Sequence, residues 1–308
     1  MRPPLGGRPE GSAGVNTTGR ARVIGVIGGS GLYDIEGFED ARWIAVDSPF
    51  GRPSDEFHVG HIGGQRVAFL PRHGRGHKIP PSEINFRANV DAMKRLGVTD
   101  LLSVSAVGSL REELPPGTFV LVDQFIDRTF ARAKSFFGTG LVAHVSMADP
   151  VCHKMGALVA EAATRADVGL VQGSTYLAME GPQFSSLAES ELYRSWMCHV
   201  IGMTNMPEAK LAREAELCYA SVAMVTDYDC WHEGHADVTV SQVIKVLHDN
   251  AAKARALIKA AVPLLGTRPR PCAQGCENVL EHAVITAPEA RDPAMVARLS
   301  AVAGRVLQ

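Results

Sequence analysis

The 308-residue sequence has no excess of charge of either sign, because 31 lysines and arginines face 33 aspartates and glutamates. This balance excludes a general basic footprint for nucleic acid or for an acidic membrane surface. No apolar run reaches the roughly 18 residues that a membrane span needs, and residues 1–20 lack the apolar segment of a secretory signal. The six cysteines are too few for a disulfide scaffold. These absences predict a cytoplasmic globular protein with reduced thiols.

What the sequence does contain is enough apolar material for a large core, since 46% of its residues are hydrophobic. Short apolar runs predict buried strands at 23–27, 67–70, 101–105, 119–122, 174–178 and 218–225. Helical patterns alternate with these runs and begin at Ser82 and at the capping-box pairs 186/189 and 239/242. This alternation predicts an α/β layer fold around a mostly buried sheet.

Composition divides the chain into three segments. Residues 1–20 are rich in glycine, proline and arginine and predict a disordered arm. Residues 21–266 carry the α/β pattern, and a breaker-rich stretch at 266–271 separates a helical tail at 267–308 that is too short for its own core. In this tail Cys272 and Cys276 have no partner pair downstream, so we interpret them as structural rather than metal-binding and expect no metal.

Glycines and cationic side chains follow two of the predicted strands. Residues 28–31 read Gly-Gly-Ser-Gly and let backbone N–H groups approach an anion. A dinucleotide fingerprint requires glycine where Asp34 stands, and a simple tight turn remains equally open. Residues 72–77 hold two arginines and two histidines, which suit phosphate at a strand end. A solvated basic loop is the alternative there, and no third ligand completes a zinc site.

Polar residues also follow the later strands. Hydroxyls at 103–109 suit phosphate oxygens, and a carboxylate and an aromatic ring flank a Gly-Pro turn at 179–185. Thr204 precedes a predicted helix start, where a positive helix end favours anions. Asp227 and Asp229 point the same way if the strand continues. Such a pair can bind a metal, perform acid–base chemistry or accept hydrogen bonds from an amine, and a solvated turn is the alternative.

Together these motifs resemble the purine nucleoside phosphorylase family, most closely its 5'-methylthioadenosine phosphorylase branch. The matching segments are 28–32, 72–74, 85–89, 180–184, 203–208 and 226–229, within an unbroken resemblance over about residues 22–265. The resemblance implies one α/β domain with a mixed central sheet flanked by helices, in a homotrimer or a dimer of trimers. It implies that phosphate displaces adenine from 5'-methylthioadenosine, without an organic cofactor and without nucleic-acid or membrane partners.

The resemblance also assigns roles to individual residues. The implied phosphate contacts are Ser30, Arg72, His73, Ser105, Ala106 and Thr204. The implied nucleoside contacts are Phe184, Met203, Asp227, Tyr228, Asp229, Val240, Val243, Ile244 and, from a neighbouring subunit, His144. Asp227 and Asp229 are the implied catalytic pair, and Ser185 and Val240 are implied in specificity. An ordinary helix core stripe is the alternative for the three aliphatic residues.

The residue types agree with this chemistry. Glycosidic cleavage passes through an oxocarbenium-like transition state, which bound phosphate stabilises, and a buried aspartic acid with a raised pKa can protonate the leaving purine at N7. The nearest alternative is phosphorolysis of 6-oxopurine nucleosides or methylthioinosine, against which two hydrogen-bond acceptors argue. A nicotinamide-dependent oxidoreductase would need the missing fingerprint spacing, and a non-catalytic nucleoside-binding protein would not need so many phosphate contacts.

Overall fold

A nine-stranded sheet organises the described part of the chain. The computed structural model describes residues 21–29, 31–233 and 240–307, without the side chains at 240–243, 245 and 247. The strands follow the order β2-β3-β4-β1-β5-β8-β7-β6-β9. They are β1 Ile24–Gly28, β2 Phe38–Ile44, β3 Phe57–Ile62, β4 Gln65–Pro71, β5 Asp100–Ser109, β6 Phe119–Asp127, β7 Leu170–Ala178, β8 Val200–Gly202 and β9 Cys218–Asp227.

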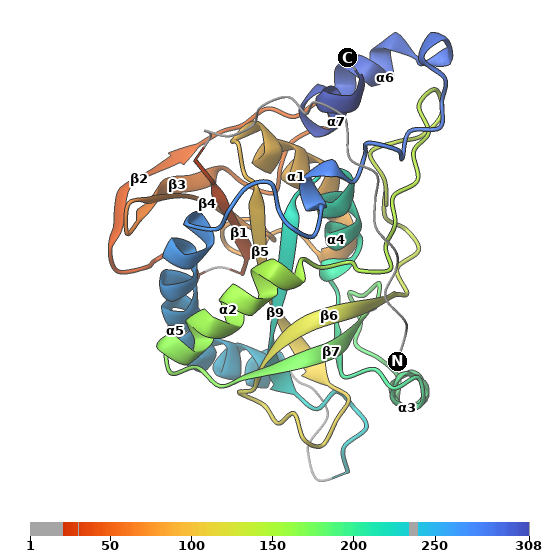
Figure 1. Cartoon of the computed structure of the whole chain (residues 1–308). Coiled ribbons are helices and arrows are strands. Elements are labelled where there is room, and N and C mark those ends of the chain that lie inside the picture. The colour runs from red at the N-terminus through yellow and green to blue at the C-terminus, as the bar shows by residue number, and fades with distance from the viewer. Residues whose placement is uncertain (1–20, 30, 234–239, 308) are drawn as a thin grey trace, which may run out of the picture.

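The sheet closes on itself because β5 also pairs with β9. Strands β5, β8, β7, β6 and β9 therefore form a small barrel, and β1 to β4 extend from it as an open wing (Figure 1). Parallel and antiparallel pairs are mixed, which confirms the predicted α/β fold with a mixed central sheet. All six predicted strands are present. The sequence missed β2, which is largely exposed, together with β3 and the three-residue β8.

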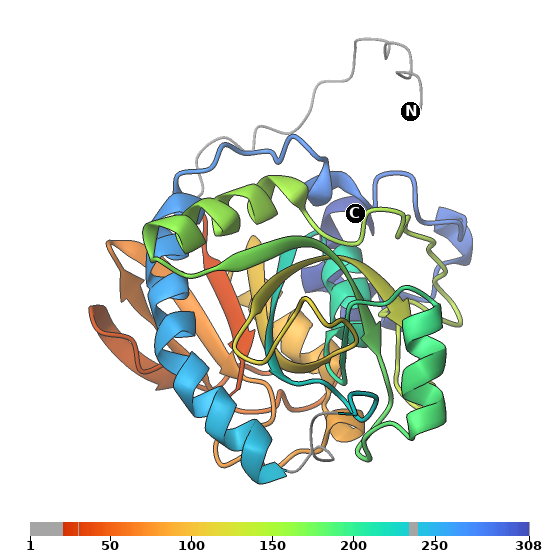
Figure 2. The ribbon, with the colours of Figure 1, turned by 90° about the horizontal axis from the view of Figure 1, so that it is seen from below.

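Helices cover both sides of this sheet. They are α1 Phe86–Arg95, α2 His153–Arg165, α3 Leu187–Ser195, α4 Asn205–Glu214, α5 Val240–Gly266, α6 Pro293–Arg298 and α7 Ser300–Leu307. Helices α2 and α5 lie side by side and share one apolar core cluster, whereas α1, α4 and α7 belong to a second (Figures 1 and 2). None of the described helices combines the length and hydrophobicity that a bilayer crossing requires.

The predicted helix starts have different outcomes. The Ser186–Glu189 capping box is confirmed at α3. The start at Ser82 is wrong, because α1 begins after Asn85, whose side chain accepts from the amide of Ala88 at 3.1 Å. A 3₁₀ turn at Pro81–Glu83 precedes it instead. The pair at 239 and 242 lies outside the described residues.

The segment at 267–308 packs back onto the sheet domain. Leu280, Leu299 and Val302 are buried in the same core cluster as α1 and α4. Arg305 adds an ion pair with Glu216 at 2.6 Å. The segment therefore shares the hydrophobic core of residues 21–266, and the predicted arm at 1–20 lies outside the described residues.

Candidate active site

The strand ends that carry the predicted site residues meet at one edge of the sheet. Strands β4, β1, β5 and β9 are neighbours and run parallel, so their carboxyl ends point the same way. The amide of Arg72 donates to the carbonyl of Gly28 at 2.9 Å, which joins the first two predicted loops. Gly108 of β5 is in register with Asp227 of β9. Such an edge is where α/β sheets bind ligands.

A strand of opposite direction brings Thr204 to this edge. Because β8 is antiparallel to β5, the chain after Gly202 returns along β5 towards Ser105. The Ser105 hydroxyl donates to Asn205 Oδ1 at 3.0 Å, and both residues are buried. Thr204 is the N-cap of α4, but Met206 has extended dihedral angles, so regular helix begins only at the residue after it. The helix end therefore lies slightly further from Thr204 than the sequence indicated.

Arg72 lies in a buried ion pair beneath this edge. Its Nε donates to Glu208 Oε2 at 2.9 Å, and its other donors reach the carbonyl of Val104 and, at 2.6 Å, the hydroxyl of Ser103. Burial alone would lower the pKa of Arg72, and the Glu208 carboxylate more than reverses this effect. Because these groups and the carbonyl of Ile27 occupy most of the guanidinium fork, at most one N–H of Nη1 remains for phosphate among the described contacts.

His73 is held as a neutral ring beside Arg72. Burial and, to a lesser extent, the neighbouring Arg72, His77 and Arg132 lower its pKa to about 4, although a hydrogen bond to the Ile79 carbonyl raises it. Its Nδ1 lies 2.8 Å from that oxygen, and the ring stacks on His77 with centroids 4.2 Å apart. When Nδ1 carries the proton, Nε2 is an acceptor. His73 can therefore accept a hydrogen bond from a protonated phosphate oxygen.

The two aspartates meet at the end of β9, although not by strand periodicity. Asp227 is the last residue of β9, and Asp229 adopts φ 55°, so the strand does not continue. The turn is held by the Asp229 amide, which donates to Asp227 Oδ1 at 2.8 Å, while the Thr226 hydroxyl donates to Oδ2 at 2.7 Å. A side chain at Gly108 would approach both residues, at 2.9 Å from Asp227 Oδ1 and 3.4 Å from Asp229 Cβ. Glycine is therefore required beside the pair.

The electrostatics of this pair favour a protonated carboxyl. Burial raises the pKa of Asp227. Burial also raises the pKa of Asp229, and the negative charge of Asp227 raises it further. The resulting pKa is about 6, although the Ser190 hydroxyl lowers it. Asp229 Oδ2 is buried and has no hydrogen-bond partner among the described residues. An unpaired buried carboxyl oxygen is costly, so a ligand with a matching donor would relieve that cost.

The remaining predicted residues have mixed positions. Met203 lies against the Gly181 turn, where an added Cβ would come within 2.5 Å of its sulfur. Phe184 is 45% exposed and Ile244 is 58% exposed. Tyr228 is buried, and its hydroxyl donates to the Glu112 carbonyl at 3.3 Å.

Ala106 and Ser185 flank this region from different elements. Ala106 is half-buried on β5, and Ser185 is buried directly before α3. His144 lies on an exposed segment, where its amide donates to Ala283 at 2.9 Å. Ser30 and the side chains of Val240 and Val243 lie outside the described residues.

Sequence reasoning missed Arg132, which joins two of the site's loops. Its side chain is almost fully buried, and Nε donates to Glu180 Oε1 at 3.0 Å. Its Nη1 donates to the carbonyl of Met206 at 2.8 Å and to that of Met203 at 2.5 Å. Glu180 is the carboxylate partner of Arg132 in this contact. Burial alone would raise its pKa, but hydrogen bonds from Ser82, two backbone amides and Arg132 lower it to about 2. No periodic pattern surrounds Arg132, so no local signal could have identified it.

The family of the chain follows from comparison with known proteins. The family model described as the phosphorylase superfamily matches residues 23–263. The chain belongs to this superfamily, which confirms the resemblance that the motifs indicated.

Within this superfamily, the chain is similar to two enzymes that carry the same name. The chain is 62% identical to the S-methyl-5'-thioadenosine phosphorylase of Cereibacter sphaeroides over 286 residues, which are 93% of this chain and 99% of that protein. It is also 62% identical to the enzyme of the same name from Rhodospirillum rubrum, over 94% of this chain and 98% of the relative.

Solved structures agree with these relatives. A crystal structure of a methylthioadenosine phosphorylase from an Antarctic soil metagenomic library superposes with a TM-score of 0.87 at 45% identity, covering 92% of this chain and 99% of that one. A methylthioadenosine phosphorylase from Schistosoma mansoni in complex with adenine gives 0.80 at 35% identity, over 84% and 98% of the two chains.

We predict that Arg72→Ala lowers the free energy of unfolding by about 3–5 kcal/mol, because it leaves the Glu208 carboxylate buried without its cation. The matched control is Arg75→Ala on the same loop, whose exposed ion pairs with Asp55 and Glu56 predict a much smaller loss than that of Arg72→Ala. Urea unfolding of both variants measures the difference. Equal losses would contradict a structural role for the Arg72–Glu208 pair.

Proposed function

We propose that this chain catalyses the phosphorolysis of 5'-methylthioadenosine to adenine and 5-methylthioribose 1-phosphate, a reaction of purine and methionine salvage. The observation that carries this proposal is the buried pair of Asp227 and Asp229, with one carboxyl oxygen lacking a partner. A 6-aminopurine offers a donor at its amino group and an acceptor at N7. A carboxylate and a protonated carboxyl complement these two groups.

Phosphate is the second substrate, and we assign its binding to the hydroxyls of Ser105 and Thr204, which lie at the same edge of the sheet. His73, Ala106 and Ser30 complete the proposed phosphate contacts, and Arg72 contributes its remaining N–H from below. The bound anion stabilises the positive charge that develops on the ribose ring as the bond to the base lengthens. Neutral His73 accepts a hydrogen bond from a protonated phosphate oxygen through Nε2, and its lowered pKa keeps the ring uncharged.

The departing adenine gains electron density at N7 and leaves faster when it is protonated there. Asp227, whose pKa is raised by burial, supplies this proton, and Asp229 accepts from the 6-amino group. We assign the ribose to Met203 and the base to Phe184 and Tyr228, with Ser185 beside the base. The helical residues Val240, Val243 and Ile244 receive the methylthio group.

One substrate panel tests the reaction. We expect free adenine from methylthioadenosine only when phosphate is present, and much less base from methylthioinosine and inosine, because O6 would face a carboxylate. Chromatography of the released base, with adenosine as a further substrate, measures this. Base release independent of phosphate would refute phosphorolysis, and preferred release of hypoxanthine would assign the site to 6-oxopurines.

We predict that Asp227→Asn sharply lowers turnover of methylthioadenosine, because an amide donates a hydrogen bond but does not transfer a proton. The amide of the variant can also donate towards O6 on the edge of the base that Asp227 shares with Asp229, so the efficiency ratio of methylthioinosine to methylthioadenosine rises by more than about tenfold, or roughly 1.4 kcal/mol. Steady-state kcat/KM for both substrates provides the measurement. Asp123→Asn on β6 serves as the control, with an unchanged ratio; a shift below tenfold in Asp227→Asn would remove that residue from recognition of the 6-position.

We further propose a homotrimer in which His144 of one subunit reaches the ribose 5' end in the site of its neighbour. His144 is exposed in the single chain and lies outside the helices and strands. Its side chain is therefore accessible to another subunit. Val142, two residues before it, is 39% exposed. An interface could cover this apolar surface.

Mixed assemblies test this arrangement. We predict that inactive His144→Ala and Asp227→Ala subunits regain activity when they are refolded together, because some hybrid sites then receive both native residues. Mass measurement verifies the mixed assembly, and each variant refolded alone is the control. Verified hybrids without activity would show that His144 does not act in a neighbour's site.

A further inference from the structure

Four cysteines that are distant in the sequence converge at the amino-terminal end of β9. The sulfurs of Cys152, Cys218, Cys272 and Cys276 all lie within 4.8 Å of one another, and all four residues are buried. From the sequence, Cys272 and Cys276 were interpreted as structural rather than metal-binding, because no partner pair follows them in the chain. The missing pair stands upstream, at the N-cap of α2 and at the first residue of β9.

The spacing of these sulfurs is that of a tetrahedral metal site. Zinc binds thiolates at about 2.3 Å, which places the sulfurs of a tetrahedron about 3.8 Å apart. The sulfurs of Cys152 and Cys272 are 3.6 Å apart, and each remaining edge needs to close by about 1 Å at most. The two ligands from residues 267–308 are brought together by a turn at Gly275, whose φ is 75° and whose amide donates to Cys272 at 2.8 Å.

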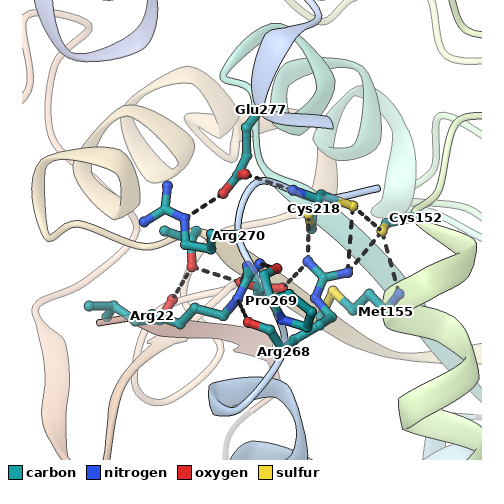
Figure 3. A network of polar contacts seen from close by, with 12 residues as sticks. Arg22, Cys152, Met155, Cys218, Arg268, Pro269, Arg270 and Glu277 are labelled. Atoms are coloured by element: carbon teal, nitrogen blue, oxygen red, sulfur yellow. Dashed lines mark hydrogen bonds and ion pairs between the residues drawn. The ribbon is translucent and has the colours of Figure 1, made fainter. Parts of the chain in front are cut away.

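Two arginine side chains direct hydrogen-bond donors at the four sulfurs. Arg268 Nη1 lies 3.2 Å from Cys152 Sγ and 3.8 Å from Cys272 Sγ, and its Nη2 lies 2.7 Å from Cys218 Sγ. Figure 3 shows this guanidinium directed at the sulfurs of Cys152 and Cys218. The fourth sulfur, of Cys276, faces Arg213 Nη1 at 3.9 Å. Guanidinium groups only donate, so this arrangement suits negative charge on sulfur.

The charges balance when a divalent cation is added. Four thiolates around Zn²⁺ carry a net charge of −2, and the guanidiniums of Arg268 and Arg213 supply +2. Asp100 also contacts Arg268 at 2.6 Å, and its charge is offset by Arg22, which it pairs with at 2.6 Å. A buried site with no net charge avoids the desolvation cost of an unpaired ion.

We propose that these four cysteines bind one Zn²⁺ ion in a closed structural site. A complete set of four protein ligands leaves no open coordination position for catalysis. The ten-residue strand β9 separates the site from Asp227 by about 30 Å. Its role is to fasten residues 267–308 to α2 and β9. A pocket of about 570 Å³ lined by Arg213, Gln274 and Gly275 borders this turn.

Elemental analysis of the purified protein tests the proposal. We expect one zinc per chain in wild type expressed with zinc and never exposed to chelator, and loss of that zinc in the double variant Cys272→Ser/Cys276→Ser. The control is Cys198→Ser, a buried cysteine outside the cluster, which should keep its zinc. Wild-type protein without stoichiometric zinc would overturn the proposal, as would full zinc retention in the double variant.

A second measurement uses wild type alone, in case the double variant does not fold. Replacing zinc by Co²⁺ should produce the intense visible bands and thiolate charge-transfer absorption of a tetrahedral tetrathiolate site. Intact mass without reductant should correspond to six reduced thiols once the metal is removed. A mass lower by the hydrogens of two disulfides, or cobalt spectra without thiolate bands, would refute the site. Because release of adenine is measured separately, failure here leaves the proposed function unaffected.

Discussion

The buried ion pair between Arg72 and Glu208 is the interaction on which the candidate site depends. It joins the loop after β4 to the start of α4, and the same network reaches Ser103 and the Tyr219 hydroxyl. A buried pair of this kind costs more to break than it contributes as a pair. A substitution that removes one partner would leave an uncompensated charge in the core beneath the loops of the site.

Closure of the sheet gives the site its second constraint. The β5–β9 pairing places Gly108 against Asp227, and the antiparallel β8 returns the chain to Ser105. Arg132 then ties the loops at 180 and 203–206 together from the inside. The proposed phosphate contacts and base contacts consequently arise from different strands that share one edge. This is the arrangement that a reaction between two bound substrates needs.

Local pattern predicted most of the fold because the buried strands are short, apolar and followed at once by glycine or polar residues. It failed at β2, which is mostly exposed and has no apolar alternation, and at Ser82, whose hydroxyl donates to the carboxylate of Glu180 instead of capping a helix. The motif residues were identifiable from type and order. Glu208 lies within the 203–208 motif, but its pairing with Arg72 was not identifiable, and neither was the role of Arg132, because these contacts join residues 136 and 48 positions apart.

The sequence by itself determined the α/β class and the order of the site motifs, which follow from periodicity and local residue types. It also indicated the family, through the resemblance of those motifs to known members. Only the tertiary structure decided that Asp227 and Asp229 meet through a left-handed turn, and that Arg72 is paired within the core. The four cysteines also show this difference between what the sequence and the tertiary structure determine. Their spacing along the chain has no metal-binding pattern, and only the packing of residues 267–308 against α2 and β9 brings their sulfurs within 4.8 Å of one another.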